Sequence, residues 1–335
     1  MRCIGHVSMP FVAIRLACFA TLALLVIGSA PAGAQDFPSR TVRMLVPYPS
    51  GGPDVVARLL AEQMTLLLGK PVIIENRSGG GGVPAIVELM NSPPDGHTLM
   101  VADPSHWGVL PALRTDLPYE PLRDLSPVSL MYTGEGLLIY VNGASPLRDV
   151  QSLVAQAKEK PGTMTYSVTG VGGLNHVIGE SFKSALALNI QAIVFKGGGE
   201  AIESVLRGDV SYGMLGITAL AEFVKAGRLR LLAVATRSRH KQALDVPTVM
   251  EAMGLANYDF PIQVAIVTRA GTPKAIVDRL SATIAKAAQH PPAIAKVRPI
   301  GIEITPSTPE QLGEIMRNDS RKFAQIVKAT GMKLE

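Results

Sequence analysis

Short apolar runs alternate with amphipathic helical stretches along this chain, and no other feature of the sequence restricts the fold as much. The runs have strand length and are bounded by turn-forming residues, whereas the stretches between them repeat apolar residues at helical spacing. Such alternation is typical of α/β proteins, and it predicts mainly parallel sheets. The predicted strands cover residues 42–47, 71–76, 98–103, 136–142, 164–168, 190–195, 210–215, 229–236 and 264–268.

Two segments interrupt this alternation and are candidate domain boundaries. The first, 117–136, is rich in proline and precedes a new strand and helix series, and the second begins at 237. If the chain crosses between two lobes at both places, the first lobe is discontinuous. Residues 35–136 would then form its first part, 137–236 the second lobe, and 237–335 the return to the first lobe with C-terminal helices. The last 25 residues or so, from 309, read as an ordinary surface helix.

Residues 1–34 have the pattern of a secretory signal peptide. Two arginines are the only charged residues there, an apolar run covers 16–27, and small residues precede an expected cleavage site after Ala34. The run has 12 residues, fewer than the roughly 20 that span a bilayer. We therefore expect export to the periplasm. Both cysteines lie within this segment, so the mature chain would have neither a thiol nor a disulfide.

The charge of the chain gives no reason to expect a nucleic-acid partner. The net charge is +5, or +3 once the two arginines of residues 1–34 are removed, and no block of consecutive Lys and Arg residues gives the concentrated charge that phosphate binding requires. The histidines are scattered and no HExxH motif is present, so we expect neither a metal nor a cofactor. The string GxSxG, which would indicate a hydrolase nucleophile, is also missing.

Glycine-rich turns follow several predicted strands and precede helical sequence. They are SGG (50–52), SGGGG (78–82), TGVGG (169–173) and KGGG (196–199). A glycine turn before a helix directs several backbone N–H groups at one place, and the helix dipole adds partial positive charge there. The turns match neither the phosphate-binding GxxxxGK motif nor the dinucleotide motif GxGxxG. We therefore expect the first and third turns to bind a carboxylate.

Nine blocks of sequence, in order, resemble one known family. They include VRMLVPYPSGGPDVVARLLAEQM, GKPVIIENRSGGGG, PPDGHTLMVAD, KEKPGTMTYSVTGVGGLNH, FKGGGEAI and AGTPKAIVDRL. They resemble the tripartite tricarboxylate transporter receptors, also called Bug receptors. The resemblance implies a two-lobed periplasmic binding protein, type 2 like, with a mainly parallel sheet in each lobe and a ligand cleft between them. It also implies a small organic acid as ligand and delivery to integral membrane permease subunits. We expect such a receptor to be a monomer.

Matching the family's two ligand-binding loops to this chain gives the candidate site. The resemblance implies that backbone amides and hydroxyls of both loops hold a ligand carboxylate. The matched residues are Pro49, Ser50, Gly51, Gly52 and Asp54 in the first loop, and Thr169, Gly170, Gly172 and Gly173 in the second.

The side chains near these loops have more than one interpretation. We interpret Asp54 as the cap of the helix that orders the first loop rather than as a ligand contact. Ser105 and His106 follow a predicted strand and either line the same crevice or belong to a surface turn. His176 is interpreted as a packing or capping residue. Trp107 is either a core aromatic or a residue beside the crevice that reports closure by fluorescence.

The sequence departs from the family pattern in ways that bear on the ligand. Only Pro53 separates Gly52 from Asp54, where the family usually has two residues, one of them a hydroxyl residue. Leu215 and Gly216 stand where members that bind amino acids have an acid, which disfavours an amino-acid ligand. Two alternatives to a transport receptor stay open: an exported enzyme such as a hydrolase that acts on a small acid, and a receptor that feeds a membrane sensor.

Overall fold

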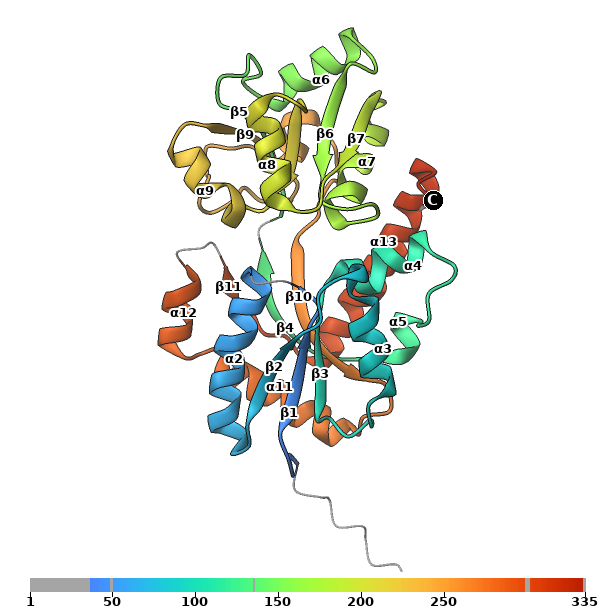
Figure 1. Ribbon diagram of the computed structural model, residues 1–335, viewed down its shortest axis with the longest axis vertical. Coiled ribbons are helices and arrows are strands. Elements are labelled where there is room, and N and C mark those ends of the chain that lie inside the picture. The colour runs from blue at the N-terminus through green and yellow to red at the C-terminus, as the bar shows by residue number, and fades with distance from the viewer. Residues whose placement is uncertain (1–36, 49–50, 135, 299–301, 334–335) are drawn as a thin grey trace, which may run out of the picture. The chain divides into compact units, whose positions relative to one another are not determined.

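A computed structural model gives the structure of the chain. It describes residues 37–48, 51–134, 136–298 and 302–333. The predicted signal peptide lies outside these residues, as do Pro49 and Ser50. The described chain forms two sheets surrounded by helices, which confirms the predicted α/β class (Figure 1). No described helix has both the length and the apolar character needed to cross a bilayer.

The first sheet combines strands from both ends of the described chain. In sequence order its strands are β1 (Val42–Val46), β2 (Val72–Asn76), β3 (Thr98–Ala102), β4 (Leu125–Gly134), β10 (Ile262–Arg269) and β11 (Glu303–Ile304). Their order in the sheet is β11–β4–β10–β3–β1–β2. The helices of these parts of the chain are α2 (Gly52–Leu68), η1 (Gly80–Gly82), α3 (Val83–Asn91), η2 (Ser105–Val109), α4 (Leu110–Leu113), α5 (Pro121–Asp124), α11 (Lys274–Ala287), α12 (Pro291–Val297) and α13 (Pro309–Thr330).

The second sheet is built from the middle of the chain. Its strands are β5 (Leu138–Asn142), β6 (Met164–Val168), β7 (Ile190–Val194), β8 (Tyr212–Leu215) and β9 (Leu229–Val234), in the order β7–β6–β8–β5–β9. The accompanying helices are α6 (Val150–Glu159), α7 (Leu174–Leu186), α8 (Gly198–Arg207), α9 (Ile217–Lys225) and α10 (Val249–Met253). The chain passes from the first sheet to the second between β4 and β5, and it returns between β9 and β10. The lobe limits expected from the sequence stay a prediction.

The prediction of mainly parallel sheets is wrong for both sheets. β1 pairs parallel with β2 and β3, but β10 runs antiparallel to β3 and β4. In the second sheet β6 pairs parallel with β7 and β8, whereas β5 runs antiparallel to β8 and β9. β4 carries the chain out of the first sheet and β10 brings it back, so these adjacent strands have opposite directions. The spacing of apolar residues in the sequence does not show which strands will pair with one another.

The proline-rich segment 117–136 is not a linker, because it contains the ten-residue strand β4. Proline lacks an N–H donor and is tolerated within sheets at irregular positions. Pro127 lies next to a shift in register between β4 and β10, at Ile266 and Val267. The candidate boundary segment therefore includes a strand of the first sheet, and the irregular register removes the conflict between proline and the hydrogen-bond ladder.

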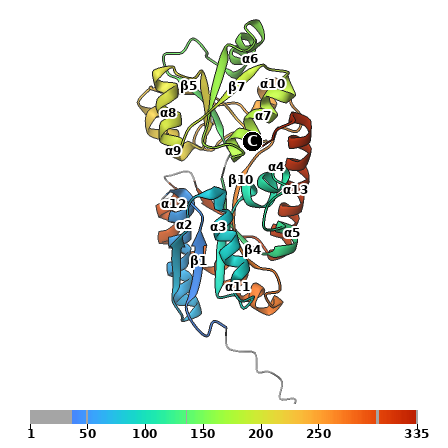
Figure 2. The same ribbon diagram turned by 45° about the vertical axis from the view of Figure 1, so that its right-hand side comes forward.

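The C-terminal segment forms the expected helix, and one face of it is buried. Helix α13 lies beside α4 in both views and packs against β4 and α7 (Figure 2). Leu312 and Met316 belong to the core of the first sheet, while Phe323 joins the core of the second. A Cβ at Gly108 of η2 would lie 2.6 Å from Phe323 Cδ2, so glycine is needed for this close packing. The helix therefore contributes to the cores of both sheets.

Truncation of Phe323 tests this packing. The side chain is 3% exposed, so Phe323→Ala should lower the free energy of unfolding by about 3 kcal/mol or more through lost burial and a cavity. Urea unfolding followed by circular dichroism measures the change. Gln325→Ala, at an exposed position of the same helix, is the matched control. Equal stability of the two variants would contradict the assignment of α13 to the core.

Candidate functional site

Both predicted carboxylate loops lie between a parallel strand and a helix. The first follows β1 and leads into α2, whose N-cap is Gly51, and the second follows β6 and leads into α7, whose N-cap is Gly173. Neither helix has a side-chain cap among the described residues. An uncapped helix start leaves N–H groups of the first turn without an intrahelical partner. The strand, turn and helix arrangement expected from the sequence is thus present at both loops.

Asp54 is not the cap of α2, and this interpretation is wrong. It is the third residue of the helix, and its carboxylate accepts hydrogen bonds from Arg58 Nε at 2.9 Å and from Asn76 Nδ2 at 2.8 Å. Burial opposes ionisation of Asp54, but the hydrogen bonds from Arg58 and Asn76 outweigh it and lower the pKa of the carboxyl. The residue is therefore a buried anion whose charge is already compensated within the chain.

Asn76 connects Asp54 to the start of the first loop. Its Nδ2 also lies 3.3 Å from the backbone oxygen of Tyr48, the last described residue before the loop. Asp54 is thus connected to Tyr48, the residue before the loop, through Asn76 at the end of β2 and not through a helix cap. Sequence reasoning missed Asn76 because the contact depends on the pairing of β1 with β2, which places Val46 opposite Asn76.

Ser105 and His106 belong to η2, at the end of β3, and they differ in exposure. His106 is 3% exposed, and its Nδ1 lies 2.9 Å from Asp103 Oδ1. A Cβ at Gly82 would collide with His106 Nε2. The glycine run 78–82 therefore makes room for a buried histidine. Ser105 is half-buried and donates its backbone N–H to Asp103 Oδ1 at 2.8 Å.

Asp103 is a second anion near the first loop, and its side chain is half-buried. Burial disfavours its charge, but the attraction of His106 and the hydrogen bonds to the carboxylate lower the pKa of Asp103 below its ordinary value. Burial and the nearby Asp103 in turn raise the pKa of the Tyr48 hydroxyl well above its ordinary value. This cluster holds the carboxyl ends of β1 and β3 together, and it makes His106 a structural residue rather than an exposed ligand contact.

The glycines of the second loop have backbone conformations that differ from one another. Gly170 has φ 143° and Gly172 has φ 72°, and both values lie in the region that favours glycine. The N–H of Gly172 donates to His176 Nδ1 at 3.1 Å, and the N–H of Gly173 donates to the oxygen of Gly170 at 3.2 Å. These two N–H groups already have partners in the chain. The Gly172–His176 hydrogen bond is the kind of capping contact expected of His176.

Asn175 is a polar residue of the second loop that sequence reasoning did not select. It is the second residue of α7 and is 5% exposed. Its Oδ1 lies 3.3 Å from Thr169 Oγ1, while its Nδ2 is buried without a hydrogen-bond partner among the described residues. A buried donor without a partner costs free energy unless a ligand or water accepts from it. An amide side chain two residues after the GG pair was the only signal in the sequence.

The fourth glycine turn, 196–199, differs from the two candidate loops. The N–H of Lys196 donates to Glu200 Oε2 at 3.1 Å, so an acid of the helix itself occupies the position before α8. A carboxylate there reduces the attraction for another anion. The glycine turn at 196–199 is therefore less suited to bind an anion than the two candidate loops.

Trp107 is a core residue and not a crevice residue. Its side chain is fully buried in the cluster that α3 and α13 form with the first sheet, and its Nε1 donates to Asp319 Oδ2 at 2.9 Å. Burial raises the pKa of Asp319, although the bond from Trp107 opposes this. In the part of the chain that the structure describes, no group of three or more His, Cys, Asp or Glu side chains could hold a metal ion.

The match to a known family decides what kind of protein this is. A family model described as tripartite tricarboxylate transporter family receptor matches residues 56–332. The chain belongs to this family. Protein BugT of Bordetella pertussis is 31% identical over 309 residues, which cover 92% of this chain and 94% of BugT. As a member of this family the chain is a solute-binding receptor and not an enzyme.

Solved structures of other proteins agree with this assignment. A protein described as a periplasmic transporter has a TM-score of 0.78 and 31% identity, over 89% of this chain and 100% of its own. R. palustris Rpa4515, solved with adipate, has a TM-score of 0.79 and 28% identity over 89% and 99% of the two chains. MatC of Rhodopseudomonas palustris, solved with malate, has a TM-score of 0.76 and 26% identity over 87% and 100%. The expected two-lobed receptor fold is therefore confirmed.

The hydrogen bond from Gly172 to His176 predicts that the stability of this receptor depends on pH. Burial lowers the pKa of His176, so the folded state binds the proton less readily than the unfolded state. The stabilisation by neutral His176 is then complete above the ordinary pKa of about 6.5 and is lost as the pH falls through the lower pKa of the folded state. Between about pH 7 and pH 5 the wild type should lose more stability than His176→Gln, as thermal unfolding measures. Parallel losses in both proteins would show that this contact does not sense pH.

Proposed function

We propose that this receptor binds a small carboxylate between its two lobes through the first and third glycine turns. The observation that supports this most directly is that α2 and α7 both start without a side-chain cap. Helix α2 follows strand β1 of the first sheet, and α7 follows strand β6 of the second sheet. Both helix starts favour an anion through unpaired N–H groups and the helix dipole. Neither described loop brings a free side-chain cation, so backbone dipoles carry the recognition.

The proposed ligand contacts come from three parts of the chain. Ser105 of η2 supplies a hydroxyl near the first loop, and Asn175 adds the buried Nδ2 donor beside Thr169. Asp54 orders the first loop and does not touch the ligand. The remaining proposed residues are Pro49, Ser50, Gly51 and Gly52 of the first loop, with Thr169 and Gly170 of the second. Gly172 and Gly173 shape the second loop, because their N–H groups already donate within the chain.

A carboxylate fits this set of groups better than a phosphate or a cation. Amide and hydroxyl donors satisfy a planar carboxylate, and ordered water can complete the contacts. The relatives solved with adipate and with malate support the same class of ligand. The carboxylates of Asp54 and Asp103 are already paired, so neither is free to attract an ammonium group. An amino acid is therefore a poorer candidate than a simple organic acid.

The rest of the proposal concerns location and partners. The expected cleavage after Ala34 would release the receptor into the periplasm as a monomer. There the 35–136 and 237–335 parts form one lobe and 137–236 the other, and the loaded receptor delivers its acid to the membrane permease subunits of a tripartite transporter. Family membership supports this delivery role over a sensor role.

Thermal unfolding of ligand-stripped receptor tests the proposal. An acid at about 100 times its Kd should stabilise the folded state by about 2.7 kcal/mol, which is measurable as a rise in Tm. The screen should include mono-, di- and tricarboxylates, with free amino acids as a comparison. Mass spectrometry should recover the bound acid unchanged. If no carboxylate raises the Tm, or if the acid is consumed, the proposed function is wrong.

The Asn175 donor gives a second test at one residue. Asn175→Asp replaces the buried NH₂ group by a carboxylate of similar shape, which would repel a bound acid and reduce affinity about tenfold to a hundredfold. Isothermal titration measures the Kd. Asn91→Asp, the same change at an exposed position at the end of α3, is the control. Equal affinities of both variants would remove Asn175 from the site.

A further inference from the structure

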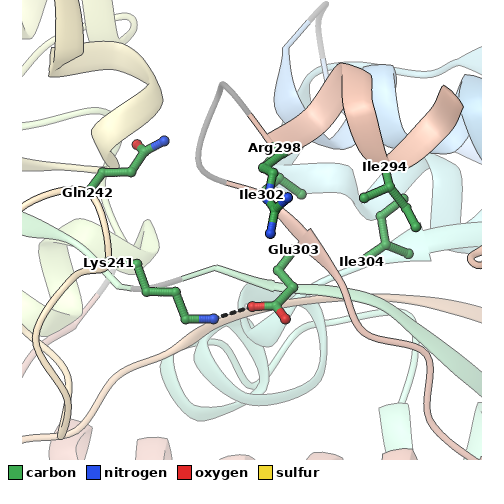
Figure 3. Close-up of a pocket in the computed structure, with 7 residues that line it drawn as sticks. All are labelled: Lys241, Gln242, Ile294, Arg298, Ile302, Glu303 and Ile304. Atoms are coloured by element: carbon green, nitrogen blue, oxygen red, sulfur yellow. Dashed lines mark hydrogen bonds and ion pairs between the residues drawn. The ribbon is translucent and has the colours of Figure 1, made fainter. Parts of the chain in front are cut away.

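Tyr132 of β4 lies beside the start of α2, although sequence reasoning did not select it. A Cβ at Gly52, the first residue of this helix, would lie 3.8 Å from the Tyr132 hydroxyl oxygen. The same Cβ would lie 3.2 Å from Cδ1 of Ile302, which Figure 3 shows on the segment before β11. Tyr132 and Ile302 therefore flank the point where the first glycine turn enters its helix.

A bulge in β4 gives Tyr132 this position. Side chains alternate between the two faces of a regular strand, so Leu130 and Tyr132 would share a face. Leu130 belongs to the core cluster that includes α3 and α13, whereas Tyr132 lies outside this cluster and beside α2. The two residues pair with consecutive residues of β10, 265 and 264, which leaves Met131 as an extra residue of β4. Such bulges redirect side chains and are over-represented next to active sites.

The hydroxyl of Tyr132 is a donor without an acceptor in the described part of the chain. The residue is 5% exposed, and its hydroxyl makes no hydrogen bond with any residue that the structure describes. Burial and the charge of Asp103 raise the pKa of Tyr132 above its ordinary value, so the hydroxyl keeps its proton. A buried donor of this kind costs free energy unless a ligand or water accepts from it.

Proline leaves the start of α2 short of donors. Pro53 is the second residue of the helix and has no N–H. The N–H of Val55 donates to the Gly51 oxygen at 2.9 Å and is therefore engaged within the helix. This leaves the N–H groups of Gly52 and Asp54 in the first turn to face a ligand. A hydroxyl beside Gly52 replaces the donor that the proline removes.

We infer that Tyr132 is a ligand-binding residue whose hydroxyl donates a hydrogen bond to the carboxylate held at the start of α2. This inference rests on the proposed function, because the first glycine turn must hold the acid. Tyr132 pairs with Val264 of β10 on one side and with Ile304 of β11 on the other, so its backbone is fixed before the ligand arrives. A tyrosine ring has two torsions, and little conformational entropy is lost when it binds.

A purely structural role for Tyr132 would have a different consequence. A structural hydroxyl stabilises the fold through its acceptor, and no described residue accepts from Tyr132. Removal of the hydroxyl should therefore leave the ligand-free receptor at least as stable as the wild type, because an unpaired buried group is lost. Ligand binding should weaken at the same time. A variant that binds less tightly without being less stable separates recognition from folding.

Isothermal titration of Tyr132→Phe tests the inference. The probes are butanoate, malate, adipate and citrate, with any further carboxylate that raises the Tm of the wild type. For every acid that binds the wild type, Tyr132→Phe should weaken binding about tenfold to a hundredfold, the effect of losing a hydrogen bond to a charged acceptor. Urea unfolding of the ligand-free proteins should show that Tyr132→Phe is at least as stable as the wild type.

Tyr140→Phe is the matched control. The Tyr140 hydroxyl is also buried without a hydrogen-bond partner among the described residues, but Tyr140 lies in β5 of the second sheet. This variant should bind each acid with the affinity of the wild type.

The outcomes separate this inference from the proposed function. If the acids bind the wild type and Tyr132→Phe equally well, the inference is wrong while the proposed function stands. The same conclusion follows if Tyr132→Phe is less stable than the wild type, or if Tyr140→Phe loses as much affinity. If no carboxylate binds the wild type, the proposed function and this inference both fail.

Discussion

The antiparallel pairing of β4 with β10 is the constraint on which the rest of this structure depends. The two strands carry the chain out of the first sheet and back into it, and they are hydrogen-bonded along eight residues of β10, from Ile262 to Arg269. This pairing closes a sheet whose strands are separated by more than a hundred residues in the sequence. Because such distant contacts are costly in chain entropy, the buried cores on both faces must compensate for them. Helix α13 adds to that compensation by packing on β4 and contributing to both cores.

The candidate site follows from where the parallel strands end. β1 and β6 each finish at a glycine turn, and each turn is positioned by polar side chains from neighbouring elements. Asp54 and Asn76 hold the start of the first turn, and His176 holds the second through the N–H of Gly172. Charges near the turns are therefore paired internally.

The sequence predicted many local elements because their signals are local. The strand at 164–168 has the same limits in the structure, and Gly69 ends α2 in the left-handed conformation that its position suggested. Strand β4 was not predicted because its prolines were taken as signs of a connecting segment. In the structure, the irregular register between β4 and β10 accommodates Pro127. Asp54 was given the wrong contact because its partner, Asn76, is brought close only by strand pairing.

The order of hydrophobic runs, the glycine turns and the family resemblance determined the fold class and the kind of protein from the sequence alone. These depend on short-range patterns, which a linear chain displays directly. Only the tertiary structure decided which strands became neighbours, which loop amides were already occupied and which side chains far apart in the sequence came into contact. Such contacts join residues as distant as Lys241 and Glu303, or Trp107 and Asp319. Their formation depends on the packing of whole elements, and no local pattern encodes it.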